Sequence, residues 1–91
     1  MGAMCRNIRP LNNFEPPTTR SEIQAAALQY VRKVGGATQP SKANEQAYAV
    51  AVAAITRATE ELLGSLVTTA PPKNREVEAA KARARAQARY A

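Results

Sequence analysis

The chain has 91 residues, and its 13 lysines and arginines against seven glutamates give a formal net charge of +6. It contains no histidine, aspartate or tryptophan, and its one cysteine is Cys5. This composition excludes catalytic triads, aspartate dyads, ordinary zinc sites and an internal disulfide, because the side chains that build them are missing. We therefore expect a protein that is not an enzyme, that has no catalytic residues, metal site or cofactor, and that acts by binding a partner.

The size of the chain limits its hydrophobic core. A domain this small buries only about 60 to 65% of the surface of its unfolded chain, and alanine supplies much of the 45% apolar content. One cysteine and no histidine provide neither disulfides nor structural metals, so self-association is the remaining common way to bury more surface. We expect a homo-oligomer, with a dimer as the simplest form.

No segment of the sequence is typical of a membrane protein. The longest unbroken apolar run, residues 47–55, is far too short to cross a bilayer of about 30 Å. The N-terminus lacks the long apolar region of a signal peptide. We expect a cytoplasmic protein without membrane contact. Residues 1–3 precede a second methionine and resemble a cloning remnant, which makes Met4 the expected natural start.

Residues 4–18 are expected to form an irregular N-terminal arm. Prolines and asparagines between residues 10 and 17 interrupt any helical or strand period. Ile8, Leu11 and Phe14 recur as isolated apolar anchors. We expect these anchors to fold back onto a single helical domain formed by residues 19–91.

The sequence predicts a first helix over residues 19–35. Thr19 and Glu22 have the spacing of a capping box, in which each side chain satisfies an unpaired backbone amide. Apolar residues follow at helical spacing, and we expect them to form one buried face. They are Ile23, Ala26, Ala27, Tyr30, Val31 and Val34. Gly35 and Gly36 then supply the left-handed stop.

A second and longer helix is predicted over residues 41–67, with Ser41 as its N-cap. One apolar stripe consists of Tyr48, Val52, Ile55, Thr59, Leu62 and Leu66, and a second stripe beside it consists of Ala47, Ala51, Ala54 and Ala58. A helix that is apolar over most of its circumference is contacted on more than one side. We expect the alanine-rich face to be the surface through which the protein associates.

A third helix is predicted over residues 74–90. Asn74 is its expected cap, and Glu76 and Glu78 lie in the first turn, where the helix dipole favours acidic side chains. Its apolar stripe is narrow and consists of Val77, Ala80, Ala84, Ala88 and Ala91. The helix therefore has high intrinsic propensity but little surface to bury.

Together these elements predict an all-α fold. We expect an antiparallel helical hairpin, a third basic helix, and the irregular N-terminal arm packed across them. A DNA-binding helix-turn-helix is the alternative, with Lys42, Asn44 and Gln46 as base readers. The connection from Gly35 to Pro40 is longer than the usual turn of that motif, so the hairpin is favoured.

Several segments together carry a resemblance to a known family. They are Met4-Cys5-Arg6-Asn7-Ile8-Arg9, Phe14-Glu15-Pro16-Pro17, the run from Ala25 to Val34, and Pro40-Ser41 with Asn44. In these segments the chain resembles an uncharacterised bacterial family, domain of unknown function twenty-two seventy-seven. The resemblance covers nearly the whole chain from Met4, but the family has no established activity, ligand or catalytic residue. One departure is Gly35, where the family commonly has serine; we expect the glycine to loosen the helix end.

Positive charge concentrates at the C-terminal end. The segment from Ala70 onward contains six lysines and arginines but only two glutamates. This excess of four positive charges makes up most of the net charge of +6. The candidate binding residues here are Lys81, Arg83, Arg85 and Arg89. Four-residue spacing places Lys81, Arg85 and Arg89 on one helical face, where they could follow a nucleic-acid backbone. A solvated helix explains the same pattern, and few residues of the segment could read or stack on bases.

The arm carries the other candidate sites. If Met4 is the natural start, Cys5 becomes the terminal residue once the methionine is removed. The nearby Arg6 and Arg9 would stabilise its thiolate for metal capture, oxidation or attack on a thioester. The alternative is that Cys5 is a small apolar anchor. Arg6 and Arg9 could also bind a phosphate or carboxylate, or they could tie the arm down through Glu15, Glu60 or Glu61.

These observations favour one interpretation of function and leave two open. The favoured one is a non-enzymatic binding or adaptor module that acts as a small helical oligomer. Its basic C-terminal helix would contact nucleic acid or an acidic protein. One alternative is a thiol-dependent role of Cys5, and the other is a purely structural dimer.

Overall fold

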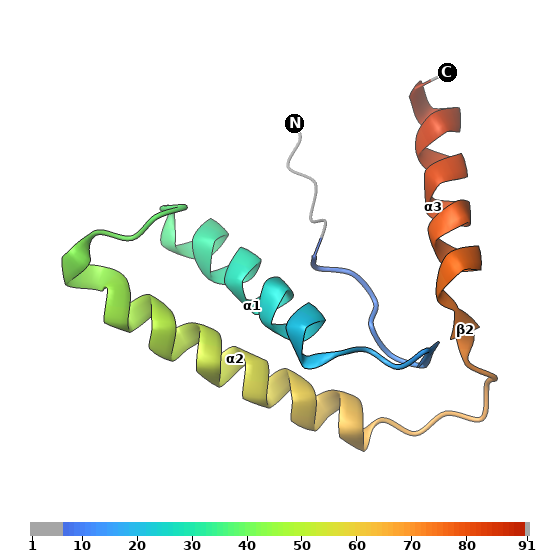
Figure 1. Ribbon diagram of the computed structural model, residues 1–91, viewed down its shortest axis with the longest axis horizontal. Coiled ribbons are helices and arrows are strands. Elements are labelled where there is room, and N and C mark those ends of the chain that lie inside the picture. Colours follow the sequence, from blue (N-terminus) through green and yellow to red (C-terminus); the bar gives the residue numbers. More distant parts are fainter. Residues whose placement is uncertain (1–6, 91) are drawn as a thin grey trace.

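The protein forms a two-helix hairpin with a third helix attached beside it (Figure 1). The structure is a computed structural model, and it describes residues 7–90. Its elements, in chain order, are β1 (Phe14–Glu15), α1 (Arg20–Gly35), the 3₁₀ turn η1 (Lys42–Asn44), α2 (Glu45–Ser65), β2 (Lys73–Asn74) and α3 (Arg75–Tyr90). The all-α prediction is confirmed, apart from one pair of two-residue strands. The hairpin of α1 and α2 is antiparallel, as predicted.

Both predicted ends of α1 are confirmed. The backbone N–H of Glu22 donates to the Thr19 hydroxyl at 3.3 Å, and the backbone N–H of Thr19 donates to the Glu22 carboxylate at 2.9 Å. These bonds satisfy amides that the first turn of a helix leaves unpaired. At the other end, Gly36 has a φ of 82°. This left-handed conformation ends the helix, and glycine adopts it without strain.

The connection between α1 and α2 is held by Tyr48. Its hydroxyl donates to the carbonyl of Ala37 at 3.1 Å and accepts from the N–H of the same residue at 3.3 Å. A Cβ atom at Gly35 would lie 2.9 Å from Cζ of the Tyr48 ring. The glycine therefore makes room for this tyrosine, which is a more specific role than the loosening expected from the sequence.

The ends of α2 differ from the prediction. The Ser41 side chain makes no capping hydrogen bond, and the chain passes through η1 before the regular helix begins at Glu45. The helix ends at Ser65 rather than at residue 67, because the next residue, Leu66, is already extended with a ψ of 137°. A glycine in the last turn and the β-branched run of residues 67–69 disfavour a further turn.

A small core lies between α1 and α2. Ile23, Ala27 and Val31 are buried at helical spacing, and Thr56 of α2 is 1% exposed. The Thr56 hydroxyl donates to the carbonyl of Val52 at 2.7 Å, so this buried polar group is satisfied within its own helix. Other residues of the predicted apolar stripes stay largely exposed, namely Tyr30 (51%), Val34 (70%), Leu62 (56%) and Leu66 (46%). In the described chain, the hairpin leaves these side chains without a covering layer.

The arm joins α1 to the base of α3. Phe14 and Glu15 of β1 pair in parallel with Lys73 and Asn74 of β2. Just before β1, the carbonyl of Asn13 accepts a hydrogen bond from the N–H of Lys73 at 2.8 Å. The sequence contained no signal for this pairing, because two residues are too few to show an alternating pattern.

The predicted anchors of the arm are covered to different extents. Leu11 and Phe14 are half-buried, whereas Ile8 is 41% exposed. The arm is also tied to α1 by a hydrogen bond from the N–H of Asn7 to the Gln29 side chain at 2.9 Å. The arm therefore does pack against the helical domain, and it does so through polar contacts as well as apolar ones.

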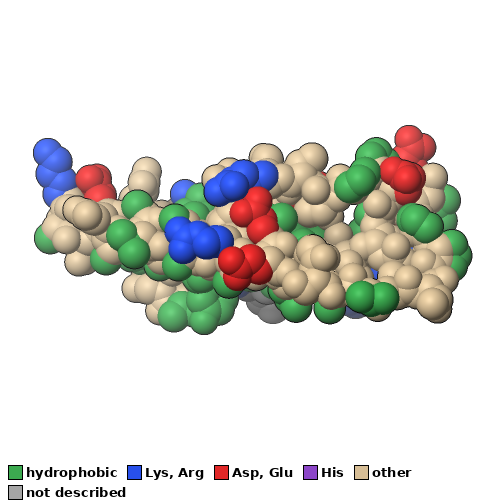
Figure 2. All heavy atoms as spheres, turned by 90° about the horizontal axis from the view of Figure 1, so that it is seen from below, with side chains coloured by type: hydrophobic (Ala, Val, Ile, Leu, Met, Phe, Trp, Pro, Cys, Tyr) green, Lys and Arg blue, Asp and Glu red, His purple; other side chains and the backbone are tan. Residues whose placement is uncertain are grey.

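The protein is a flat slab. Its principal extents are 44 × 38 × 15 Å, and the view down the shortest axis shows the three helices beside one another (Figure 1). The radius of gyration is 15.5 Å, whereas a compact domain of this length has about 12 Å. Figure 2 shows the slab edge-on, with apolar side chains reaching its surface along much of its length. Since stable domains bury their apolar faces between packed layers, this slab lacks a second layer.

The buried positions of α1 predict where the chain is sensitive to substitution. Replacing Ile23, which is 6% exposed, with valine should lower the free energy of unfolding by about 0.5–1.5 kcal/mol, because it leaves a cavity. Val67 is 94% exposed, so its replacement with alanine should change that free energy by less than about 0.5 kcal/mol. Urea denaturation measures both. Equal effects at the two positions would contradict the packing described.

Candidate functional site

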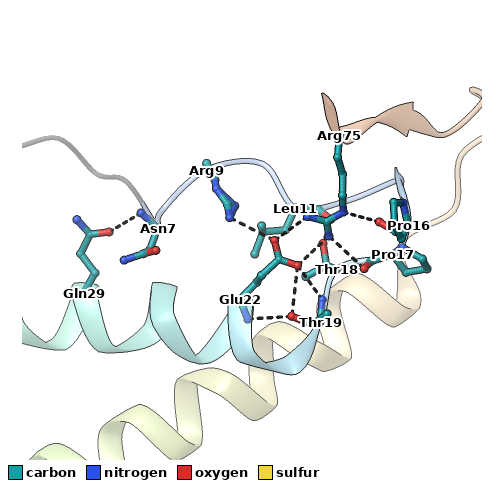
Figure 3. Close-up of polar contacts among 10 residues, drawn as sticks. All are labelled: Asn7, Arg9, Leu11, Pro16, Pro17, Thr18, Thr19, Glu22, Gln29 and Arg75. Atoms are coloured by element: carbon teal, nitrogen blue, oxygen red, sulfur yellow. Dashed lines mark hydrogen bonds and ion pairs between the residues drawn. The ribbon is translucent and has the colours of Figure 1, made fainter. Parts of the chain in front are cut away.

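A cluster of polar contacts surrounds Glu22, in the first turn of α1 (Figure 3). Its carboxylate accepts two hydrogen bonds from Arg75, at 2.8 Å to Oε2 and 2.7 Å to Oε1. Arg9 of the arm donates to Oε2 at 3.2 Å. A bidentate guanidinium–carboxylate pair fixes both orientation and distance. Glu22 therefore joins the arm, α1 and the start of α3 at one point.

Arg75 also holds the end of the arm. Its Nε donates to the carbonyl of Pro16 at 2.7 Å, and its Nη2 donates to the carbonyl of Pro17 at 3.1 Å. The guanidinium lies 5.8 Å from the centroid of the Phe14 ring, within the range of a cation–π contact. Since Arg75 is the first residue of α3, these contacts fix where that helix starts.

The electrostatics of the cluster favour its charged form. The pKa of Glu22 is lowered from 4.5 to about 2, and the largest cause is the hydrogen bonding from Arg75. The hydrogen bond from the Thr19 backbone and the charges of Arg75 and Arg9 also lower this pKa, while burial raises it. The hydrogen bond to Glu22 in turn raises the pKa of Arg75. A carboxylate that stays ionised over the physiological range is not poised to transfer protons. The cluster is therefore suited to hold segments together.

The predicted sites of the arm have different outcomes. Cys5 and Arg6 lie outside the described residues, so the proposed thiol chemistry stays a prediction. Arg9 does tie the arm down, but its acidic partner is Glu22 rather than the glutamates expected from the sequence. One of those glutamates, Glu60, instead pairs with Arg20 across the hairpin at 3.3 Å.

The four candidate cations of α3 all lie on exposed positions. Lys81 approaches Glu78 one turn earlier at 3.5 Å. Arg83 and Arg85 have no carboxylate partner among the described residues, and Arg89 takes part in an interaction of its own. The cap of this helix is as predicted, because Asn74 accepts a hydrogen bond from the N–H of Val77 at 3.0 Å. The structure therefore presents these cations along a helix that begins at the Glu22 cluster.

The contact between Glu22 and Arg75 was not predicted from the sequence. The two residues are 53 positions apart, and each had a local explanation. Glu22 completes a capping box, and Arg75 counts as one more charge of the basic tail. Nothing in the periodicity of the helices links them, because the contact depends on the course of the arm and of the segment after α2.

Within residues 7–90, no group of three or more cysteine or acidic side chains could hold a metal ion. No helix of that part is long and apolar enough to cross a membrane. Its buried side-chain nitrogen and oxygen atoms all have hydrogen-bond partners.

The ion pair predicts a pH dependence of stability. The pKa of Glu22 lies near 2 in the folded chain, against 4.5 for the same side chain without these contacts, so its contribution is complete above pH 4.5 and is lost as the pH falls towards 2. In the variant Arg75→Gln, the pKa of Glu22 should rise towards 4.5, as followed by the carboxyl resonance in an NMR titration. Arg20→Gln is the matched control and should leave that pKa unchanged. An equally low pKa in Arg75→Gln would contradict the assignment.

Comparison with known proteins identifies the family to which the chain belongs. No curated protein and no solved structure matches the chain significantly. The family described as "Uncharacterized conserved protein (DUF2277)" matches residues 4–81. The matched segment includes Arg9, Glu22 and Arg75 and stops before Arg83, so most of the cations of α3 lie beyond it. Because the match spans most of the chain, the protein belongs to the DUF2277 family, and the resemblance seen in the sequence is confirmed.

Proposed function

We propose that the protein is a non-enzymatic binding module that forms a homodimer and contacts a nucleic-acid backbone through α3. One observation carries the proposal: α3 is anchored at its first residue and extends from there with its cations exposed (Figure 1). An exposed row of cations along a helix matches the regular spacing of phosphates along a nucleic acid. The cytoplasm is the compartment that fits this function.

The dimer follows from the surface left uncovered. The chain exposes 6949 Å², whereas a folded monomer of this size exposes about 5,200 Å². The excess of about 1,700 Å² is roughly twice the area that each partner buries in a standard interface. A second copy can supply the missing layer of the slab.

The outward face of α2 is the surface we assign to this dimer. It carries Ala47, Val50, Ala54, Ala58 and Leu62 at helical spacing, all exposed, with Val50 at 60% and Leu62 at 56%. Leu62, which the sequence placed in the other apolar stripe of the helix, belongs to this face because it is exposed. Small side chains allow two helices to approach closely, and a face that pairs with itself suits a two-fold dimer.

The chemistry of α3 favours backbone contact over base recognition. Arginine and lysine bind phosphates irrespective of sequence, and sequence is read mainly by residues that reach base edges. Few residues of α3 are of the kinds that read base edges. An acidic protein would use the same cations, and it becomes the preferred partner if nucleic acid fails to bind.

The α3 surface predicts salt-dependent binding. A short fluorescent DNA duplex should bind with a dissociation constant of roughly 1–100 μM at physiological salt, as typical for contacts with the backbone. The double variant Lys81→Gln/Arg85→Gln should weaken binding and reduce the slope of log K against log salt by about 1.8, because two phosphate contacts are lost. Fluorescence anisotropy at several salt concentrations measures both quantities.

The matched control removes the same charge elsewhere. Lys42→Gln/Arg57→Gln lowers the net charge equally but changes η1 and α2 instead of α3, so it should keep most of the affinity. Equal losses in the two double variants would show attraction by net charge alone. Absence of binding to both duplex DNA and single-stranded RNA would exclude the nucleic-acid function and leave an acidic protein or a purely structural dimer.

The α2 surface predicts a measurable dimer. Ala54 lies at the centre of the exposed stripe, so Ala54→Glu should raise the dimer dissociation constant at least about tenfold by burying a carboxylate at the interface. Ala49→Glu makes the same substitution at another exposed position of α2, about 140° around the helix from Ala54, and should have little effect. Sedimentation equilibrium distinguishes the outcomes. A wild-type protein that stays monomeric at high micromolar concentration would contradict the dimer.

A further inference from the structure

A cavity of about 550 Å³ lies between the arm, the start of α1 and one face of α3. It is larger than two other cavities of the described chain, which have volumes of about 400 and 370 Å³. Pockets that hold small molecules have volumes of about 300–1,000 Å³. This one has the size for a small organic ligand, and its lining shows which chemistry it would accept.

Apolar side chains form one part of the cavity lining. Leu11 and Phe14 line it from the arm, and Ala79 and Ala82 line it from α3. The two alanines are three residues apart, so they lie on the same face of the helix, towards the arm. Their single methyl groups leave open the space that larger side chains would fill. The cavity therefore exists because α3 presents its smallest residues to the arm.

The charged residues around the cavity leave an excess of positive charge. Four cations line it, namely Arg9, Lys73, Arg75 and Arg83, against the two carboxylates of Glu22 and Glu78. Both carboxylates are already paired, Glu22 with Arg75 and Arg9, and Glu78 with Lys81. In the described chain, Lys73 and Arg83 have no carboxylate partner, and the Lys73 ammonium lies 5.1 Å from the centroid of the Phe14 ring.

We propose that this cavity binds a small amphiphilic anion, with a carboxylate or phosphate headgroup on a hydrocarbon body. Arg83 binds the headgroup, because Arg75 already donates to Glu22 and to two backbone carbonyls. Arg83 lies eight residues along α3 from Arg75, or about 12 Å at 1.5 Å per residue. The body extends over this distance, past the two alanines towards Phe14. This site is separate from the proposed nucleic-acid surface, which uses Lys81 and Arg85.

The probe that tests the site is octanoate, titrated into ¹⁵N-labelled protein at concentrations where it stays monomeric. Amide resonances of residues 79–83 should shift in a saturable manner. Octyl phosphate distinguishes a preference between the two headgroups. Octanol has the same body without charge and should bind at least about tenfold more weakly, since it cannot accept a charge-assisted hydrogen bond as an anion does. Acetate and inorganic phosphate lack the body and should cause no saturable shift.

Two variants test the assignment of residues. Arg83→Gln should weaken octanoate binding about tenfold, whereas Arg85→Gln, at a position that does not line the cavity, should not. Ala82→Leu places a larger side chain in the cavity and should abolish binding while the dispersion of the amide spectrum shows that the chain stays folded. The proposal is overturned if octanoate causes no saturable shifts, if octanol binds as tightly, or if Arg85→Gln weakens binding as much as Arg83→Gln. None of these outcomes decides the DNA titrations, because those titrations follow a different ligand and depend on Lys81 and Arg85 rather than on Arg83 and Ala82.

Discussion

The bidentate ion pair between Glu22 and Arg75 is the contact on which the arrangement of this protein depends. It joins the first turn of α1 to the first residue of α3, and through Arg75 it also holds the carbonyls of Pro16 and Pro17. The adjacent strand pair adds only four residues of backbone pairing. Without the ion pair, α3 would be a helix of 16 residues attached by a linker, and isolated helices of that length are marginal in water.

The same arrangement explains why the molecule is thin. The ion pair and the strand pair hold α3 at its base, beside the hairpin, so α3 does not cover the apolar surface of α1 and α2. The hairpin consequently keeps exposed apolar residues on its outer face, and the space between arm and α3 stays open as a cavity. A second copy and a small amphiphilic ligand are the occupants we propose for these two surfaces. Both proposals follow from surface that the monomer leaves uncovered.

The sequence predicted the elements of the fold well and their connections poorly. The capping box at Thr19, the stop at Gly36 and the cap at Asn74 are all local signals, and the structure confirms each of them. The predicted end of α2 at residue 67 was wrong by two residues, because the helix ends at Ser65. The apolar pattern continues past that point, but β-branched residues have a low helix propensity. The Glu22–Arg75 contact and the pairing of β1 with β2 join residues far apart in sequence, and a single sequence contains no signal for such contacts. The candidate cations of α3 were found from their charge and their helical spacing, while the position of the helix beside the hairpin needed the structure.

The central claim is that Arg75 orients α3 through its paired hydrogen bonds and not merely through its charge. Amide hydrogen exchange of the wild type and of Arg75→Lys tests it most directly, because lysine keeps the charge but cannot form the bidentate pair. The account predicts faster exchange in the Arg75→Lys variant throughout α3, with α1 and α2 exchanging as in the wild type. Equal protection of α3 in both proteins would contradict it and would show that the helix is held by other contacts.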